Sequence, residues 1–159
     1  MMRGMAEGKV VSLQVVPTNH AAAEHRDVVR AVEGKGIEGD WHFHRGNRAV
    51  LLMDQADLRE LDLRPGDLRE QITLELGGLM SLPSGTRLRL GQATLELSKV
   101  CAPCTHIGEH VGVEDVEAFR DRLQGRRGML ARVAAVEGDG RIRVGDRVRV
   151  ERPELARQE

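Results

Sequence analysis

Apolar and polar residues alternate in short runs along most of the chain, which is the pattern of strands with one buried face. Clusters of glycine, proline and aspartate interrupt these runs every roughly eight to twelve residues, as turns do. We therefore expect many short strands joined by tight turns. The expected strands cover residues 9–16, 28–32, 49–53, 71–76, 87–90, 93–100, 129–136 and 141–150, the last broken at Gly145-Asp146, with 18–27 as a polar connector.

A helical pattern, with apolar residues three or four positions apart, occurs in two places. Asp54 can cap a helix that runs to about Leu61. Residues 113–123 have the clearest helical spacing, and Gly125 stands where a helix C-cap belongs. Many strands and few helices favour a mainly β fold, a closed or nearly closed antiparallel β-barrel with about two short α-helices. A doubly wound parallel sheet is excluded because helices do not alternate with strands.

The 159 residues are the length of one domain. We expect a single barrel domain over residues 9–152, a flexible leader at 1–8 and a flexible tail at 153–159. Two cysteines, no secretory signal pattern and no long apolar run predict a cytoplasmic protein that does not enter a membrane. A net charge of −1 and 2% aromatic residues argue against a nucleic-acid-binding protein, which needs a basic field or stacking platforms.

Both cysteines lie in one stretch, residues 93–110, which reads ATLELSKVCAPCTHIGEH. The strand pattern stops before Pro103, which lacks a backbone donor, so we expect Cys104 on a turn just past the strand end. A thiol in that position can be exposed to solvent. Lys99 and His106 are close enough in sequence to supply the positive charge that favours the reactive thiolate.

Three other interpretations of this stretch stay open. Free cysteines are often inert residues of the core. Cys101, Cys104, His106 and His110 supply four potential zinc ligands, although a structural zinc site usually takes its ligands from two separated pairs. A thioredoxin-type redox pair requires C-x-x-C at the start of a helix, whereas the next helical pattern here begins about nine residues later.

A second polar stretch, IEGDWHFHRGNR at residues 37–48, surrounds the only tryptophan, Trp41. If residues 41–44 are extended, His42 and His44 lie on one face. A solvated surface strand is the simpler interpretation. Because polar side chains gather where strands end, we expect Cys104 to share a cleft with Asp40 and His42.

Four motifs in order resemble the MOSC family, whose members are similar to the C-terminal domain of molybdenum cofactor sulfurase. The resemblance covers about residues 9–152 and is to a stand-alone, bacterial-type, single-domain protein. It implies a β-rich barrel with a molybdenum–pterin or sulfur-carrying role centred on one cysteine, whose position matches Cys104. The motifs are GIEGDWH at 36–42, PGDLRE at 65–70, LRLG at 88–91 and APC at 102–104.

A thiolate is a soft ligand, so Cys104 can bind molybdenum or hold a persulfide sulfur. The chain departs from the family at two positions: Cys101 replaces the usual arginine two residues before Pro-Cys, and Gln71 replaces the asparagine of a Glu-Asn pair. The longer Gln71 side chain moves the amide. Candidates to bind the pterin phosphate are Lys99, Arg45, Arg48, Arg126 and Arg127, because an arginine fork can bind phosphate through two hydrogen bonds.

Several functions stay open at this point. The first is a molybdenum-cofactor oxidoreductase, similar to the amidoxime-reducing branch of the family, which reduces N-hydroxylated small molecules. The second is a carrier that hands the cofactor, or a sulfur atom on Cys104, to a partner enzyme. The third is a small zinc-binding module. The sequence shows no flavin, iron–sulfur or pyridoxal site, so we expect a separate electron-donor or sulfur-donor protein.

Overall fold

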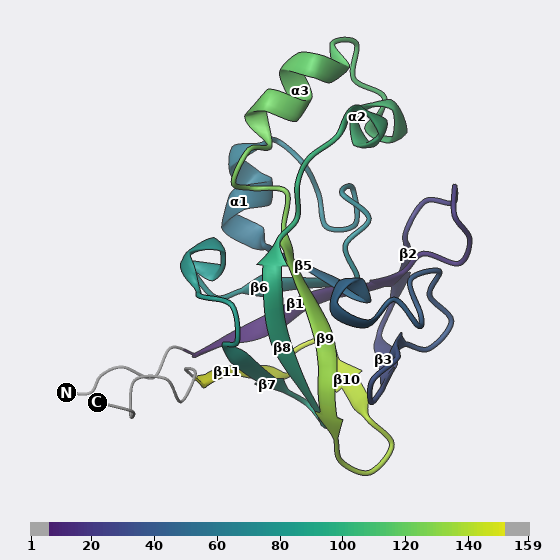
Figure 1. Ribbon diagram of the computed structural model, residues 1–159, viewed down its shortest axis with the longest axis vertical. Helices are drawn as coiled ribbons and strands as arrows, with labels where there is room; N and C mark the ends of the chain where they lie inside the picture. Colours follow the sequence, from purple (N-terminus) through teal and green to yellow (C-terminus); the bar gives the residue numbers. More distant parts are fainter. Residues whose placement is uncertain (1–6, 152–159) are drawn as a thin grey trace, which may run out of the picture.

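The computed structural model describes residues 7–151, which form a β-barrel with a pair of helices extending from one end (Figure 1). The strands are β1 (Glu7–Val15), β2 (Glu24–Arg26), β3 (Val28–Val32), β4 (Gly36–Ile37), β5 (Val50–Asp54), β6 (Ile72–Glu75), β7 (Arg87–Leu90), β8 (Ala93–Val100), β9 (Met129–Val136), β10 (Arg141–Arg143) and β11 (Arg147–Glu151). The helices are α1 (Gln55–Glu60), α2 (Thr105–Val111) and α3 (Val116–Arg122), with short 3-10 turns η1 (Gly46–Arg48) and η2 (Leu79–Ser81).

The barrel is closed, as the sequence predicts. Its strands follow the order β11-β7-β8-β9-β5-β6-β1, and β1 pairs with β11 to complete the ring. A small second sheet, β10-β3-β4, covers one side. One pairing departs from the expected antiparallel pattern, because β5 and β6 run parallel, with Leu52 opposite Ile72. The connection between them contains α1 and brings the chain back to the same end of the barrel.

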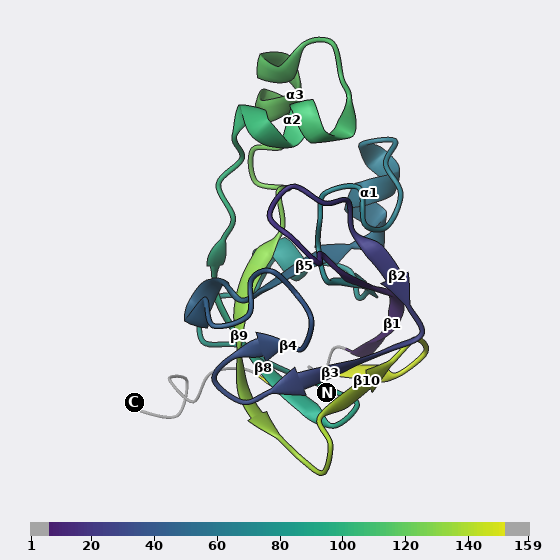
Figure 2. The same ribbon diagram turned by 90° about the vertical axis from the view of Figure 1, so that its right-hand side faces the viewer.

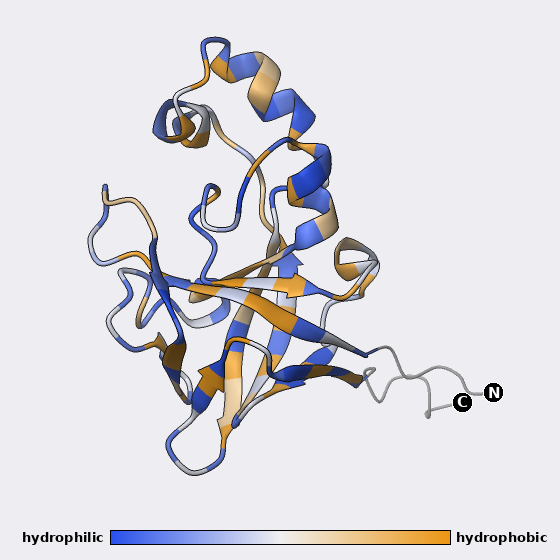
Figure 3. Ribbon diagram, turned by 180° about the vertical axis from the view of Figure 1, so that it is seen from behind, coloured by the Kyte–Doolittle hydropathy of each residue, from blue (hydrophilic) through white to orange (hydrophobic). Residues whose placement is uncertain are grey.

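Alternation along several strands places one set of side chains inside the barrel, whereas all five residues of β5 are buried. In β7 the leucines Leu88 and Leu90 are buried, while Arg87 and Arg89 face solvent. Figure 3 shows the same alternation of apolar and polar residues on other strands. The barrel interior is a single core of aliphatic side chains with no aromatic residue, and its central members include Leu13, Leu52, Ile72, Leu74, Leu88, Leu95 and Val148.

The three helices share a second, smaller core outside the barrel. Leu58 from α1, Ile107 from α2 and Phe119 from α3 pack together in it. The α2–α3 hairpin projects from the barrel and connects to it through two segments that are neither helix nor strand, residues 101–104 and 124–128, which we call the tethers (Figure 2). The tethers therefore lie between the two cores.

The structure corrects four local expectations. The chain forms three α-helices, because residues 105–111, which were not expected to be helical, make α2. The polar connector contains β2, an exposed strand that pairs with β1. Residues 41–44 are turns, not extended, and His44 has a φ of 77°. β1 begins at Glu7, two residues earlier than expected, whereas the expected tail at 153–159 lies outside the described residues.

None of the helices in residues 7–151 is long and apolar enough to cross a membrane.

Candidate functional site

A cavity of about 270 Å³ lies where the tethers meet the end of the barrel. Its walls come from the turn before β5, the loop before β6, both tethers and the starts of β5 and β9. The lining residues are Trp41, His42, Arg45, Arg48, Leu51, Arg69, Gln71, Cys101, Ala102, Cys104, Arg127 and Leu130.

The two cysteines occupy different positions in this cavity. Cys104 is exposed and stands immediately before α2, so the expected turn just past β8 is instead the end of a tether. Cys101 is buried and packs with Leu51 and Leu130. Both are free thiols. Cys104 is therefore the thiol that a solute or a partner can reach.

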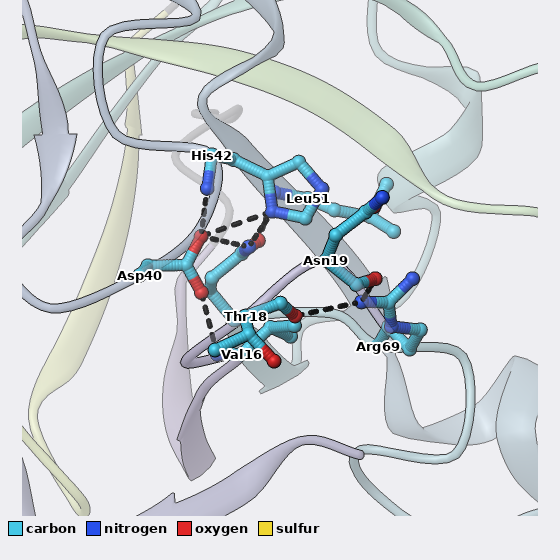
Figure 4. Close-up of polar contacts among 8 residues, drawn as sticks. Val16, Thr18, Asn19, Asp40, His42, Leu51 and Arg69 are labelled. Carbon is cyan, nitrogen blue, oxygen red and sulfur yellow. Dashed lines mark hydrogen bonds and ion pairs between the residues drawn. The ribbon is translucent and has the colours of Figure 1, made fainter. Parts of the chain in front are cut away.

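A hydrogen-bonded group centred on Asp40 lies beneath the cavity (Figure 4). Asp40 is buried, and its Oδ1 accepts a hydrogen bond from the backbone N–H of Val16 at 2.7 Å. Its Oδ2 accepts from the backbone N–H of His42 at 2.8 Å and from Gln71 Nε2 at 2.9 Å. The carboxylate thereby ties the loop that carries His42 to the end of β1.

Gln71 and Asp40 together fix the His42 ring. Gln71 Oε1 accepts from the backbone N–H of Leu51 at 2.6 Å, so its Nε2 must face Asp40 and His42. His42 Nδ1 lies 3.0 Å from Asp40 Oδ2 and 3.1 Å from Gln71 Nε2. A hydrogen bond to a carboxylate is the stronger of the two. We therefore assign a proton to His42 Nδ1, which donates it in a hydrogen bond to Asp40 Oδ2. His42 Nε2 is then the ring nitrogen that can exchange a proton with a ligand.

Four arginines line the cavity, and none of the described residues that line it is acidic. Arg69 Nε and Arg127 Nη1 are buried and have no hydrogen-bond partner within residues 7–151. Burial lowers the pKa of the Arg69 guanidinium, and the charge of Arg127 lowers it further. An arginine nevertheless stays charged at neutral pH. The cavity is therefore built to attract an anion with hydrogen-bond acceptors.

Arg69 is a site residue that the sequence pattern did not single out. It follows the turn made by residues 63–68 and has a φ of 62°, which is uncommon for a residue other than glycine. Its Nη2 donates to the carbonyl oxygens of Thr18, at 3.4 Å, and Asn19 (Figure 4). These contacts fix the guanidinium in the wall of the cavity.

Arg69 also lines a neighbouring groove of about 550 Å³. Its other walls are Asn19, His20, His106, Glu109 and His110. Burial lowers the pKa of His110, and the nearby charge of Arg69 lowers it further, which favours the neutral imidazole. The cavity and the groove thus share one charged wall.

The structure places most of the expected site residues together. Cys104, His42, Gln71, Arg45, Arg48 and Arg127 line one cavity, as the expectation of a shared cleft requires, and Asp40 supports it from below.

Two expected site residues, Arg126 and Lys99, lie elsewhere, and His44 does not share a face with His42. Arg126 forms an ion pair with Glu60 at 3.2 Å and does not line the cavity. Lys99 is exposed near the end of β8 and does not line it either. His44 packs edge-to-face against Phe43, with ring centroids 4.7 Å apart. The turn at 41–44 explains this, because it does not keep His42 and His44 on one face.

The zinc interpretation is wrong for this structure. His106 and His110 line the groove, whereas Cys101 and Cys104 line the cavity. Among the described residues there is no group of three or more histidine, cysteine or acidic side chains that could hold a metal ion. A metal that arrives within a cofactor needs only one thiolate from the protein, and Cys104 can provide it.

Comparison with known proteins identifies relatives of this chain. A model of the MOSC domain matches residues 21–149. Among solved structures, the YuaD protein of Bacillus subtilis superposes with a TM-score of 0.79 at 20% identity, covering 94% of this chain and 98% of that one.

Two YiiM structures also share the fold. YiiM of Geobacillus stearothermophilus has a TM-score of 0.69 at 17% identity, covering 93% of this chain and 75% of its own. YiiM of Escherichia coli has a TM-score of 0.62 at 20% identity, and the match covers 88% of this chain and 69% of the YiiM chain. No curated protein sequence matches the chain at a significant level.

Proposed function

The chain belongs to the MOSC domain family, and on that premise we propose that it binds a molybdenum–pterin cofactor, with Cys104 as the metal ligand, and reduces N-hydroxylated compounds. One observation carries the proposal. The exposed thiol of Cys104 lines the same small cavity as four arginines and a histidine whose orientation Asp40 fixes. A soft metal ligand, an anion site and a proton carrier therefore lie together.

The residues present fit such a cofactor in two ways. Arg69 and Arg127 offer buried N–H groups without partners, and these are suited to the oxygens of a phosphate. Cys104 offers a thiol at the open side of the same cavity, and molybdenum accepts thiolate ligands. Unpaired buried donors are costly, so the presence of two in the lining of one cavity supports a bound anion.

Reduction of an N-hydroxyl group to N–H takes up two electrons and two protons and releases water. The cofactor, when bound, supplies the two-electron chemistry. His42 can carry a proton on Nε2 to the departing hydroxyl oxygen, because its Nδ1 is held by Asp40 and its ring lines the cavity. The Gln71 side chain accepts a hydrogen bond from the backbone N–H of Leu51 and donates one to Asp40. It thereby fixes the positions of Asp40 and His42 relative to β5.

Electrons must come from another protein in this proposal. An iron–sulfur cluster takes four protein ligands, mostly thiolates, and the chain has two cysteines. The exposure of Cys104 also favours a second candidate function, in which the chain carries the cofactor or a persulfide sulfur to a partner enzyme. A sulfur atom on an exposed thiol can be attacked directly by the partner.

The test is reconstitution of the purified protein with molybdenum cofactor, followed by an assay with an N-hydroxylated purine and a small artificial reductant. We expect turnover that Cys104→Ala abolishes and Cys101→Ala keeps, with bound molybdenum lost only in Cys104→Ala. Cofactor binding without turnover supports the carrier. Failure of the wild-type protein to bind molybdenum overturns the reductase and the cofactor carrier, and leaves only the carrier of a persulfide sulfur.

A further inference from the structure

The four cavity arginines form two pairs with different surroundings. Arg69 and Arg127 have buried N–H groups and come from the loop before β6 and the second tether. Arg45 and Arg48 are exposed and come from the turn η1 on the outer rim. One phosphate group can be bound closely by one of these pairs. The other pair then needs a different anion.

In the part of the chain that the structure describes, Arg45 and Arg48 have no ion-pair partner. Many exposed arginines here pair with a carboxylate, as Arg30 does with Glu38 and Arg87 with Glu96. Within residues 7–151, neither Arg45 nor Arg48 has an acidic group within ion-pair distance. Their segment, residues 41–53, also contains no acidic residue. The rim of the cavity thus carries positive charge that the protein does not neutralise.

The backbone between these two arginines is fastened to the barrel. Ser98 of β8 donates its hydroxyl proton to the carbonyl oxygen of Asn47 at 2.6 Å. Within the turn, the backbone N–H of Arg48 donates to the carbonyl oxygen of Arg45 at 3.0 Å. The positions from which the two side chains extend are therefore fixed, and less conformational freedom is lost when they bind a ligand.

Trp41 provides a flat apolar surface beside this pair. The residue is 38% exposed and lines the cavity, although most large apolar residues in the described part of the chain are buried. The Arg45 guanidinium carbon lies over the ring, 5.2 Å from its centre, so a cation already contacts the aromatic surface. A ligand with a planar ring and an anionic group matches this combination.

We propose that the substrate is itself a phosphate monoester, an N-hydroxylated nucleotide, whose phosphate binds Arg45 and Arg48 while its base lies against Trp41. This inference rests on the proposed function and names its substrate class. A phosphate monoester carries a charge of about −2 at neutral pH, which suits two guanidinium groups. In the reaction the N–O bond breaks, two electrons and two protons are taken up, water leaves, and the phosphate is unchanged.

The first test measures binding without the cofactor. Trp41 is the only tryptophan, so its fluorescence can be titrated with adenosine 5′-monophosphate and with adenosine, and calorimetry gives an independent value. We expect the nucleotide to bind at least about tenfold more tightly than the nucleoside. The double variant Arg45→Gln/Arg48→Gln should lose that preference, whereas Arg64→Gln, an exposed arginine outside the cavity, should keep it. A preference that survives the double variant, or no preference in the wild type, overturns the inference.

The second test separates this inference from the proposed function. Reconstituted protein is assayed with N6-hydroxyadenosine and with its 5′-monophosphate. A kcat/KM at least about tenfold higher for the monophosphate, lost in the double variant, supports the inference. Equal kcat/KM values overturn the substrate class and leave the reductase standing. Reduction of neither compound, in protein that contains molybdenum, overturns both the reductase and its nucleotide substrate.

Discussion

The backbone N–H of Cys101 donates a hydrogen bond to the carbonyl oxygen of Gly128 at 2.8 Å and so joins the two tethers. Cys104 lies three residues after Cys101, and Arg127 directly precedes Gly128. The contact continues the pairing of β8 with β9, in which Val100 lies opposite Met129, by one residue into the tethers. It fixes the point at which both tethers leave the barrel.

Replacing Gly128 with alanine should loosen the tethers. Gly128 has a φ of 120°, and an added Cβ would lie 2.6 Å from Leu51 Cδ1 and 3.0 Å from the carbonyl oxygen of Leu52. We expect a loss of about 1–3 kcal/mol in the free energy of unfolding, measured by urea denaturation. Gly125→Ala is the matched control, since that position has a positive φ but nothing within 4 Å. Equal losses in the two variants would show that the clash is relieved.

Asp40→Asn should destabilise the protein because Asp40 has two carboxylate oxygens in use. They accept from the backbone N–H groups of Val16 and His42, and asparagine has only one oxygen to offer. One N–H is left facing an amide nitrogen, at a cost of about 1–3 kcal/mol in the free energy of unfolding. His42→Ala retains both backbone bonds and should cost less, while removing the proton carrier. Thermal unfolding of the two variants gives the comparison, and wild-type stability in Asp40→Asn would contradict the argument.

Glu70 should make the stability fall as the pH rises through weakly acidic values. Burial raises the pKa of this carboxyl from 4.5 to about 6 in the folded protein. Below pH 4.5 the group is protonated in both states, and above pH 6 it is ionised in both. Between them the folded protein holds a proton that the unfolded chain has released, so rising pH costs the folded state about 2 kcal/mol.

Glu70→Gln should remove that dependence. Glu70 Oε2 accepts from the backbone N–H of Gly66 and from Thr73 Oγ1, both at 2.8 Å, and a glutamine oxygen can take the same two bonds. The difference in unfolding free energy between variant and wild type is measured by denaturation at pH 4.5, 5.5 and 6.5. It should shift in favour of the variant across this range, and a constant difference would refute the assigned cause.

The two cysteines should react with iodoacetamide at different rates. Cys104 is exposed, whereas the residue Cys101 is 8% exposed and packs against Leu51 and Leu130. Mass spectrometry of the native protein should show Cys104 alkylated at least about tenfold faster. In Cys104→Ala the remaining thiol should react slowly until the protein is unfolded. Similar rates for both cysteines in the folded protein would show that the tether opens readily.

Sequence patterns predict the barrel well because several of its strands alternate between a buried and an exposed face and others are continuous apolar runs. β8 shows this clearly, with Leu95 and Leu97 buried between half-exposed neighbours. β2 carries no such signal, since all three of its residues are exposed and its order comes from pairing with β1. The parallel pairing of β5 with β6 could not be predicted either, because the relative direction of two strands depends on contacts between distant residues and not on local alternation.

Site residues could be predicted where several reactive or polar side chains stand close together in the sequence. Those that reach the cavity only through the path of the backbone could not be predicted. Cys104 and His42 stand in conspicuous stretches, and both reach the cavity. Arg69 stands in an ordinary turn, and only its positive φ and its bonds to the loop of Thr18 bring it there. Helix α2 escaped notice because it has seven residues, includes Gly108 and buries one large side chain, Ile107. Arg126 and Arg127 are neighbours in sequence, yet one pairs with Glu60 and the other lines the cavity.

Closure of the barrel by β1 and β11 has a consequence for how the protein is made on the ribosome. Glu7 pairs with Arg149, so the first strand to emerge must wait for the last strand before the ring is complete. Until residues 147–151 leave the exit tunnel, the facing edges of β1 and β7 lack their β11 partner and can pair with other chains. The α-helical hairpin is finished earlier, since its residues precede β9. Cys104 and Arg127 are therefore synthesised before the pairing of β1 with β11 closes the barrel that positions them.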